Sequence, residues 1–296
     1  MINTHINKTL DPANAETMAE YYRSAAVGNF QATLSTLADD VYFDISGDRR
    51  FLPFAGRWEG KEEVKKLFKI FSTCFALLNL TELQTTQSDC RVYSFNDETF
   101  YVHSTSRFYR VPVLHVMTFN GDHKISSLVN THDTTSAVQA FTWGDPIAVP
   151  ISYDDNQDGS LPIAGLDNDD KVINVASDIM SLIFHGDLPE NVKADNLVIY
   201  IPGLPTRDCI SGVWSDTELA NRYPQAVSEK KTRLGELRGR PSIIEVILNG
   251  RLMSINGIGG YGSHQPWTIL AKLNEIGMPQ SASLMIDFQS PVIASA

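Results

Sequence analysis

The glycine-rich run at residues 257–262 has the spacing of a dinucleotide-binding loop. It reads Gly-Ile-Gly-Gly-Tyr-Gly and satisfies the GxGxxG pattern. A dinucleotide site needs a strand before this run and a helix after it, because the helix N-terminus binds the pyrophosphate. Here Ser263-His264-Gln265-Pro266 and a β-like run follow. We interpret the run as a hairpin connection and expect no cofactor. The sequence also lacks HExxH, GxSxG and phosphate-loop motifs.

The acidic stretch at residues 144–170 contains half of a calcium loop. Four residues fit the first positions of that loop: Asp154, Asn156, Asp158 and Gly159. The twelfth position requires a bidentate glutamate, but here it is Gly165. The prolines and glycines of this stretch are typical of a loop. We therefore predict a solvated linker and no metal site, with weak calcium binding as the alternative.

Charge and cysteine content exclude several kinds of partner. The 296 residues carry 24 Lys and Arg against 35 Asp and Glu, a net charge of -11. This charge repels phosphate backbones and anionic lipid, so we expect neither nucleic acid nor membrane as a partner. The sequence shows neither a transmembrane-length apolar run nor the pattern of a secretory signal. Cys74, Cys90 and Cys209 lie far apart without zinc-site spacing, which favours a reduced, cytoplasmic protein.

Any site in the first half must be positioned by helices followed by long strands. Helical spacing marks residues 14–27, 30–38 and 61–75, and residues 41–45 alternate as a strand. Segments rich in β-branched and aromatic residues follow, with Asn120-Gly121-Asp122 as a hairpin turn before the last: 89–95, 99–109, 111–119 and 124–132. This order predicts an α+β fold with helices on one face of a curved antiparallel sheet.

The same pattern occurs twice in the chain. Residues 38–45 match residues 194–201, and Gly56-Arg57-Trp58 matches Gly212-Val213-Trp214, both at an offset of 156 residues. In the second copy we expect helices at 172–184 and 216–228, then strands at 232–240, 243–255, 266–273 and 282–288. We predict two domains, 1–143 and 171–296, joined by the linker at 144–170. We expect an intramolecular pseudo-dimer, with a homodimer of tandem chains as the alternative.

Five motifs carry a resemblance to a known fold: 28–30 (GNF), 37–41 (LADDV), 56–64 (GRWEGKEEV), 111–121 (VPVLHVMTFNG) and 133–141 (DTTSAVQAF). With them, residues 14–142 resemble the SnoaL-like polyketide cyclase and ketosteroid isomerase group of nuclear transport factor 2-like proteins. The resemblance implies a cone-shaped sheet and helices around a pocket. It is poorly specific for reaction, because this fold includes isomerases, cyclases, dehydratases, epoxide hydrolases and non-enzymes.

The resemblance places Tyr21 and His115 at the family's hydrogen-bond donor positions. Tyr21 stands eight residues before Asn29, and His115 stands four before Phe119. The isomerase general base would fall at Ile45, which departs from the family pattern. On the last strand the resemblance directs Asn130 and His132 inward. Tyr21 and His115 would then polarise a carbonyl, His132 would act as base and Asn130 would orient the substrate. We expect seven further residues to line the pocket: Phe43, Ile45, Trp58, Phe68, Val113, Met117 and Leu128.

The second copy has aliphatic residues where the first is polar. Tyr21 corresponds to Ile179, and His115 corresponds to Ile269. We therefore expect the second copy to be mainly structural.

The sequence favours a cofactor-independent acid–base enzyme of the isomerase, cyclase or dehydratase type, acting on a hydrophobic small molecule. Three alternatives stay open: a non-catalytic small-molecule binder, an epoxide hydrolase of the tandem polyether type, and a duplicated interaction scaffold.

Overall fold

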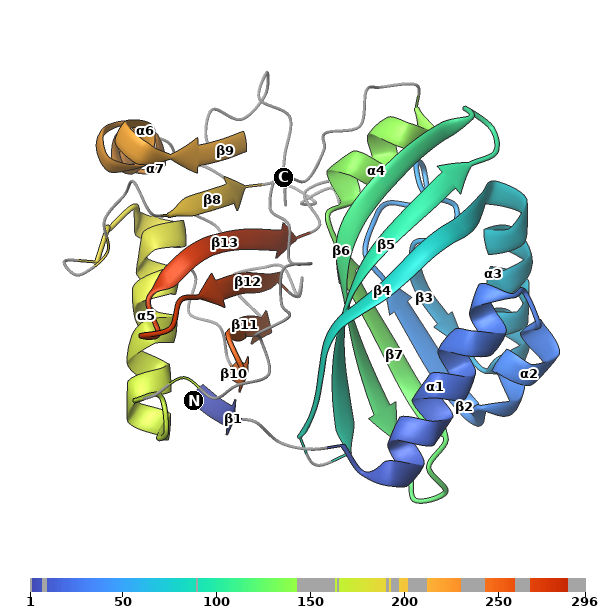
Figure 1. Ribbon diagram of the computed structural model, residues 1–296. Helices are drawn as coiled ribbons and strands as arrows, with labels where there is room; N and C mark the ends of the chain where they lie inside the picture. The colour runs from blue at the N-terminus through green and yellow to red at the C-terminus, as the bar shows by residue number, and fades with distance from the viewer. Residues whose placement is uncertain are drawn as a thin grey trace, which may run out of the picture. The chain divides into compact units, whose positions relative to one another are not determined.

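The computed structural model describes residues 2–6, 10–88, 90–142, 163, 165–189, 192, 197–201, 212–229, 243–258 and 267–286. These residues form two compact units (Figure 1). The N-unit contains the described residues from 10 to 142. The C-unit contains residues 2–6 and the described residues from 163 to 286. Each unit combines helices with one sheet, which confirms the predicted α+β class.

The N-unit has a six-stranded sheet in the order β3-β2-β7-β6-β5-β4. Its elements are α1 (Pro12–Ala26), α2 (Phe30–Ser35), β2 (Leu37–Ile45), β3 (Gly56–Glu59), α3 (Lys61–Cys74), β4 (Phe75–Ser88), β5 (Arg91–Val102), β6 (Arg107–Phe119), β7 (Ile125–His132) and α4 (Thr134–Phe141). The sheet is mixed rather than wholly antiparallel, because β2 pairs with β7 in parallel. Figure 1 shows α1, α2 and α3 on one side of this curved sheet.

Local sequence explains where the helices begin and which face they bury. Asp11 caps α1, and its side chain accepts hydrogen bonds from the backbone N–H groups of Ala13 and Asn14. Helix α3 buries Val64, Leu67 and Phe68, which recur at helical spacing on one face. These side chains join a core cluster built from N-unit residues alone.

The strands β4 and β5 differ from the sequence prediction. We expected a break between strands at 89–95 and 99–109, but β5 runs without interruption from Arg91 to Val102. The polar run Asn96-Asp97-Glu98 resembles a turn in sequence, whereas in the structure it occupies the middle of the strand. Residues 75–88 form β4, which we had not predicted because its second half is rich in Thr and Gln.

The C-unit has a seven-stranded sheet in the order β1-β10-β11-β12-β13-β8-β9. Its elements are β1 (Ile2–Ile6), α5 (Asp169–His185), β8 (Val198–Ile201), β9 (Gly212–Ser215), α6 (Asp216–Asn221), α7 (Tyr223–Glu229), β10 (Ile243–Asn249), β11 (Leu252–Ile258), β12 (Trp267–Leu273) and β13 (Pro279–Ile286). The predicted strand at 243–255 is two strands, β10 and β11, with Gly250 between them.

Strand register repeats between the two units. In the N-unit Phe43 pairs with Trp58 across β2 and β3, and in the C-unit Ile199 pairs with Trp214 across β8 and β9. Both pairs keep the offset of 156 residues that the sequence shows. Parallel pairing also recurs, between β2 and β7 and between β8 and β13. The two units therefore share one strand arrangement.

Residues 2–6 belong to the C-unit, whereas the predicted first domain includes them. Residues 2–6 form β1, which pairs in parallel with β10 of the C-unit. The unpaired backbone groups at a sheet edge are satisfied by a further strand, and this explains the pairing. The predicted strand at 232–240, most of the linker, Cys209 and Gly259–Gly262 lie outside the described residues.

Candidate functional site

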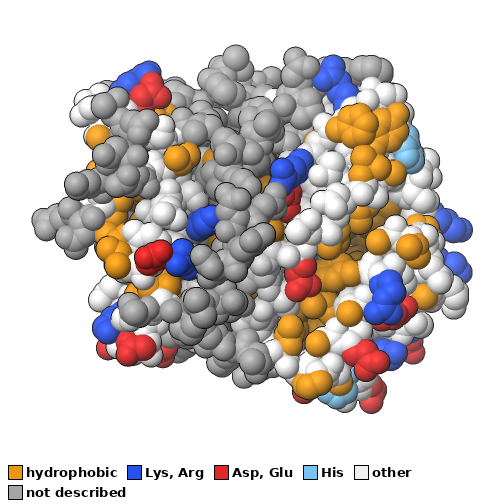
Figure 2. Space-filling view, viewed as in Figure 1, with side chains coloured by type: hydrophobic (Ala, Val, Ile, Leu, Met, Phe, Trp, Pro, Cys, Tyr) orange, Lys and Arg blue, Asp and Glu red, His pale blue; other side chains and the backbone are white. Residues whose placement is uncertain are grey.

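A cavity of about 380 Å³ lies inside the N-unit. Strands β2 and β4 to β7 and helices α1, α2 and α3 contribute to its lining. Figure 2 shows hydrophobic side chains in a hollow between β4 and the two helices. Small-molecule sites span roughly 300–1,000 Å³, so the cavity is large enough for a compact ligand.

Aromatic rings supply most of the apolar lining: Phe30, Phe43, Phe54, Phe68, Phe71, Phe75, Phe100 and Tyr109. Five of the predicted pocket residues line the cavity: Phe43, Ile45, Phe68, Val113 and Leu128. Asp44, next to Ile45, is exposed, as strand alternation requires. The carboxylate nearest to the isomerase base position therefore cannot act in this cavity.

Trp58 and Met117 do not line the cavity, which corrects two predicted pocket residues. The Nε1 of Trp58 donates to the backbone oxygen of Phe54 at 2.9 Å, and the Arg49 guanidinium stacks on its ring. These contacts hold Trp58 on β3, at the edge of the sheet. Met117 is fully buried in the core. It lies two residues beyond His115 toward the β6–β7 hairpin, so alternation alone could not distinguish it from a pocket residue.

The four predicted polar residues all line the cavity: Tyr21, His115, Asn130 and His132. Strand register brings three of them together. His115 on β6 pairs with Asn130 on β7, and His132 lies two residues further along β7 on the same face. The structure thus places these side chains at one cavity, and their catalytic roles stay predictions.

A chain of hydrogen bonds connects these polar side chains. His132 Nδ1 lies 2.7 Å from Asn130 Oδ1, and Asn130 Nδ2 lies 2.8 Å from His115 Nε2. On the other side of the ring, His115 Nδ1 lies 2.9 Å from the hydroxyl of Tyr22. Asn96 Nδ2 donates to the same hydroxyl at 3.1 Å. The chain therefore runs from β7 across β6 to α1.

The amide groups give this chain a direction. Asn130 donates to His115 Nε2, so the ring proton of His115 must be on Nδ1 and is donated to Tyr22. Ser94 donates to Asn96 Oδ1, which directs Asn96 Nδ2 toward Tyr22. Asn96 Nδ2 also lies 3.3 Å from His115 Nδ1, but that nitrogen is already a donor. The Tyr22 hydroxyl thus accepts from His115 and Asn96, and the Ser94 side chain is a third hydrogen-bonding neighbour. The hydroxyl keeps its own proton as a donor.

Burial keeps His115 and Tyr22 neutral. Burial, followed by the charge of His132, lowers the pKa of His115 from 6.5 to about 3. Burial also raises the pKa of Tyr22 and of Tyr21 well above the usual value for tyrosine. Neutral donors fixed in advance suit the stabilisation of a developing negative charge.

The contact with His115 belongs to Tyr22 and not to Tyr21. The Tyr21 ring lies edge-on to Phe43, with ring centroids 6.4 Å apart. Both tyrosines line the cavity, and of the two it is Tyr22 whose hydroxyl contacts His115, at 2.9 Å from Nδ1. The family resemblance pointed to Tyr21, whereas the tyrosine that contacts His115 is the next residue, Tyr22.

Glu98 is a buried carboxyl group in the cavity lining that sequence reasoning missed. Its Oε1 lies 4.0 Å from His115 Nε2 and has no hydrogen-bond partner among the described residues. Burial, with a smaller contribution from Asp97, raises the pKa of Glu98 from 4.5 to about 8. Asp97 on the same strand is paired with Arg110. Strand alternation could have identified Glu98, because residues 94, 96, 98 and 100 lie on one face of β5.

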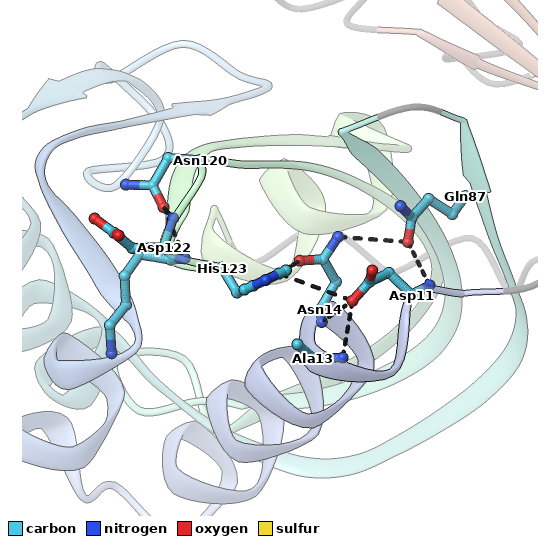
Figure 3. Close-up of polar contacts among 8 residues, drawn as sticks. Asp11, Ala13, Asn14, Gln87, Asn120, Asp122 and His123 are labelled. Carbon is cyan, nitrogen blue, oxygen red and sulfur yellow. Dashed lines mark hydrogen bonds and ion pairs between the residues drawn. The ribbon is translucent and has the colours of Figure 1, made fainter.

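A second polar cluster holds the start of α1 in place (Figure 3). Gln87 Oε1 accepts from the backbone N–H of Asp11 at 2.9 Å, and His123 Nδ1 lies 2.9 Å from the side-chain oxygen of buried Asn14. His123 belongs to the β6–β7 turn and has a φ of 56°. The cluster ties α1 to β4 and to this turn. It therefore fixes the helix that carries Tyr21 and Tyr22.

The C-unit has apolar residues at the corresponding strand positions. By register, Ile269 takes the place of His115, and its partner Leu284 takes the place of Asn130. Trp267 corresponds to Val113 and packs on Gly257, at the position of Asn96. All four are buried. At these positions the described part of the C-unit therefore has the strand arrangement of the N-unit but not its hydrogen-bonded polar side chains.

The described residues contain no helix long and apolar enough to span a membrane. They also contain no group of three or more His, Cys, Asp or Glu residues arranged to bind a metal ion.

Comparisons with known proteins gave similarities of structure only. No family model matches the sequence, and neither does any curated protein. A candidate polyketide cyclase from Xanthomonas campestris is 17% identical, with a TM-score of 0.37, over 44% of this chain and 97% of its own. A nuclear transport factor 2-like protein from Burkholderia xenovorans is 20% identical, with a TM-score of 0.39, over 44% and 96%. One from Burkholderia pseudomallei, of unknown function, is 19% identical, with a TM-score of 0.42, over 45% and 99%. These similarities each cover less than half of this chain.

Proposed function

We propose that the N-unit is a cofactor-independent acid–base enzyme of the isomerase, cyclase or dehydratase type. Its substrate is a hydrophobic small molecule that carries a carbonyl group. One observation carries the proposal: a directed chain of neutral hydrogen-bonding groups ends at the Tyr22 hydroxyl inside an apolar cavity. An open cavity favours this function over an interaction scaffold, which would fill the space with side chains.

The geometry supports a division of roles. Tyr22 donates to the ligand carbonyl and stabilises the negative charge that develops on its oxygen. His115 and Asn96 orient Tyr22, since both direct hydrogen bonds to its hydroxyl. Asn130 orients His115 and also accepts from His132 Nδ1, which leaves Nε2 as the basic nitrogen of His132. His132 is the base that we expect from the sequence.

The ligand class follows from the lining. In the part of the chain that the structure describes, the cavity lining contains aromatic and aliphatic side chains and no Lys or Arg. An anionic group would enter without a counter-charge, and this is costly in an apolar site. An uncharged aromatic ketone therefore suits the cavity. We choose 2-acetylnaphthalene as the probe, because its methyl protons exchange with deuterium when the ketone forms an enolate.

The test compares wild type with Tyr22→Phe in the full chain. We expect wild type to bind the ketone and to accelerate exchange of its methyl protons in D2O, measured by NMR. Tyr22→Phe should slow exchange by about 100-fold, the usual loss for one such donor. Tyr101→Phe is the matched control, because Tyr101 does not line the cavity. Binding without exchange in wild type would identify a non-catalytic binder and refute the enzyme.

A further inference from the structure

Glu98 is the carboxyl group in the cavity lining, and it lies outside the hydrogen-bonded chain among the described residues. It lies on β5 opposite Val111 of β6 and Leu80 of β4, both of which line the cavity. Only 4% of the residue is exposed, and its Oε1 has no hydrogen-bond partner among the described residues. A buried carboxyl oxygen without a partner costs stability, so its position calls for a ligand or a reaction to explain it.

We infer that Glu98 is the catalytic base of the N-unit: it takes a proton from the carbon next to the ligand carbonyl and returns it to the ligand. The inference rests on the proposed function and transfers the role of base from His132 to Glu98. Tyr22 and Glu98 line the same cavity from α1 and β5. A carbonyl held by Tyr22 can therefore present its neighbouring carbon to the carboxylate.

The proton transfer balances without a cofactor. The Glu98 carboxylate takes the proton, and the electron pair of the broken C–H bond forms a carbon–carbon double bond. The carbonyl π pair moves to oxygen, where the Tyr22 proton stabilises it. Glu98 then returns the proton to the same carbon or to another carbon of the conjugated system, and the carbonyl reforms. The net change is an isomerisation, or exchange with solvent deuterium.

The surroundings of Glu98 raise its pKa, so that its carboxylate is basic enough to take a proton from carbon. Its titratable neighbours in the cavity lining are Tyr21 and Tyr22 on α1, Tyr109 and His115 on β6, His132 on β7 and His103 between β5 and β6, with Asp97 on its own strand. Burial keeps the three tyrosines and His115 neutral. The helix α3 adds aromatic rings and Ser72. Burial raises the pKa of Glu98 to about 8, which makes its carboxylate a stronger base than an exposed glutamate. His115, with a pKa lowered to about 3, is too weak a base for this step.

The experiment follows exchange of 2-acetylnaphthalene protons in Glu98→Gln, with ketone binding measured separately by titration. We expect Glu98→Gln to bind the ketone within about threefold of wild type and to lose at least 100-fold in exchange rate. Retained binding shows that this isosteric variant folds. In wild type the exchange rate should rise about tenfold per pH unit below pH 8 and level off above it. Glu98→Asp should recover part of the activity.

The outcomes separate this inference from the proposed function. If Glu98→Gln exchanges at the wild-type rate and His132→Gln does not, His132 is the base, and the inference fails while the proposed function stands. If wild type binds the ketone and exchanges nothing, both fail. A rate in wild type that is flat between pH 6 and 9 also overturns the role of Glu98, because a base near pH 8 must titrate in that range.

Discussion

At the scale of single residues, burial keeps two groups of the cavity neutral, Glu98 and His115. It raises the pKa of the acid and lowers the pKa of the base. The pKa of Glu98 rises to about 8, so the carboxyl is largely protonated at neutral pH. The pKa of His115 falls to about 3, so the imidazole stays neutral. Neither group carries a full charge when the cavity is empty, and this permits both to be buried at modest cost.

The burial of Glu98 predicts a stability that depends on pH. An unfolded Glu98 loses its proton near pH 4.5, whereas the folded one keeps it until about pH 8. The folded state is therefore destabilised progressively as pH rises from 4.5 to 8, and the loss is complete above that. Glu98→Gln removes this loss, on the order of 5 kcal/mol for a pKa shift from 4.5 to about 8. We expect its melting temperature, relative to wild type, to increase between pH 5 and pH 9 in calorimetry. A constant difference over this range would contradict the raised pKa.

At the scale of elements, α1 delivers Tyr22 to the cavity only if its N-terminus is fixed. Asn14 is buried there, and its side chain contacts both Gln87 of β4 and His123 of the β6–β7 turn (Figure 3). Without the Asn14 amide, Gln87 and His123 each lose their hydrogen bond to α1 through this side chain. The cluster therefore couples the helix to the sheet at a distance from the cavity.

Asn14→Ala tests this coupling. We expect the free energy of unfolding to fall by about 1–2 kcal/mol in denaturant titrations, because the buried Asn14 amide loses its contacts with Gln87 and His123. Exposed Glu16 on the same helix provides the control, and Glu16→Ala should stay within about 0.5 kcal/mol of wild type. Ketone binding should weaken with Asn14→Ala alone, since it moves the helix that carries Tyr22. Equal effects of the two substitutions would show that the cluster does not anchor α1.

The elements also show why the sequence predicted part of this site. Helical and alternating patterns located α1, α3, β7 and most of β6. The family resemblance then selected three of the residues in the hydrogen-bonded chain: His115, Asn130 and His132. The sequence did not predict Glu98 and Asn96 as site residues, because the run Asn96-Asp97-Glu98 is polar and resembles a turn. The run stays in a strand because Asp97 pairs with Arg110 on one face while Glu98 enters the cavity on the other. Such pairing depends on register between strands, which local patterns do not encode.

At the scale of the whole molecule, one strand arrangement occurs with two different interiors. The N-unit places Asn96 and His115 at positions where the C-unit has Gly257 and Ile269. In the C-unit the Trp267 ring occupies the space next to Gly257. The C-unit therefore has at these positions the tight packing of an ordinary core, and its mainly structural role stays a prediction.

This packing makes Gly257 a sensitive position. A Cβ atom there would lie 2.2 Å from Cε2 of Trp267, closer than any relaxed contact. Gly257→Ala should therefore destabilise the C-unit by about 1–3 kcal/mol, the usual cost of overpacking. Hydrogen exchange followed by mass spectrometry should become faster in β10–β13. Gly121→Ala is the control, since a Cβ there meets nothing within 4 Å. The N-unit has a core of its own, so β4–β7 should keep their protection and ketone binding should persist. If both substitutions leave exchange unchanged, Trp267 does not pack on this backbone and the C-unit interior has space for a ligand.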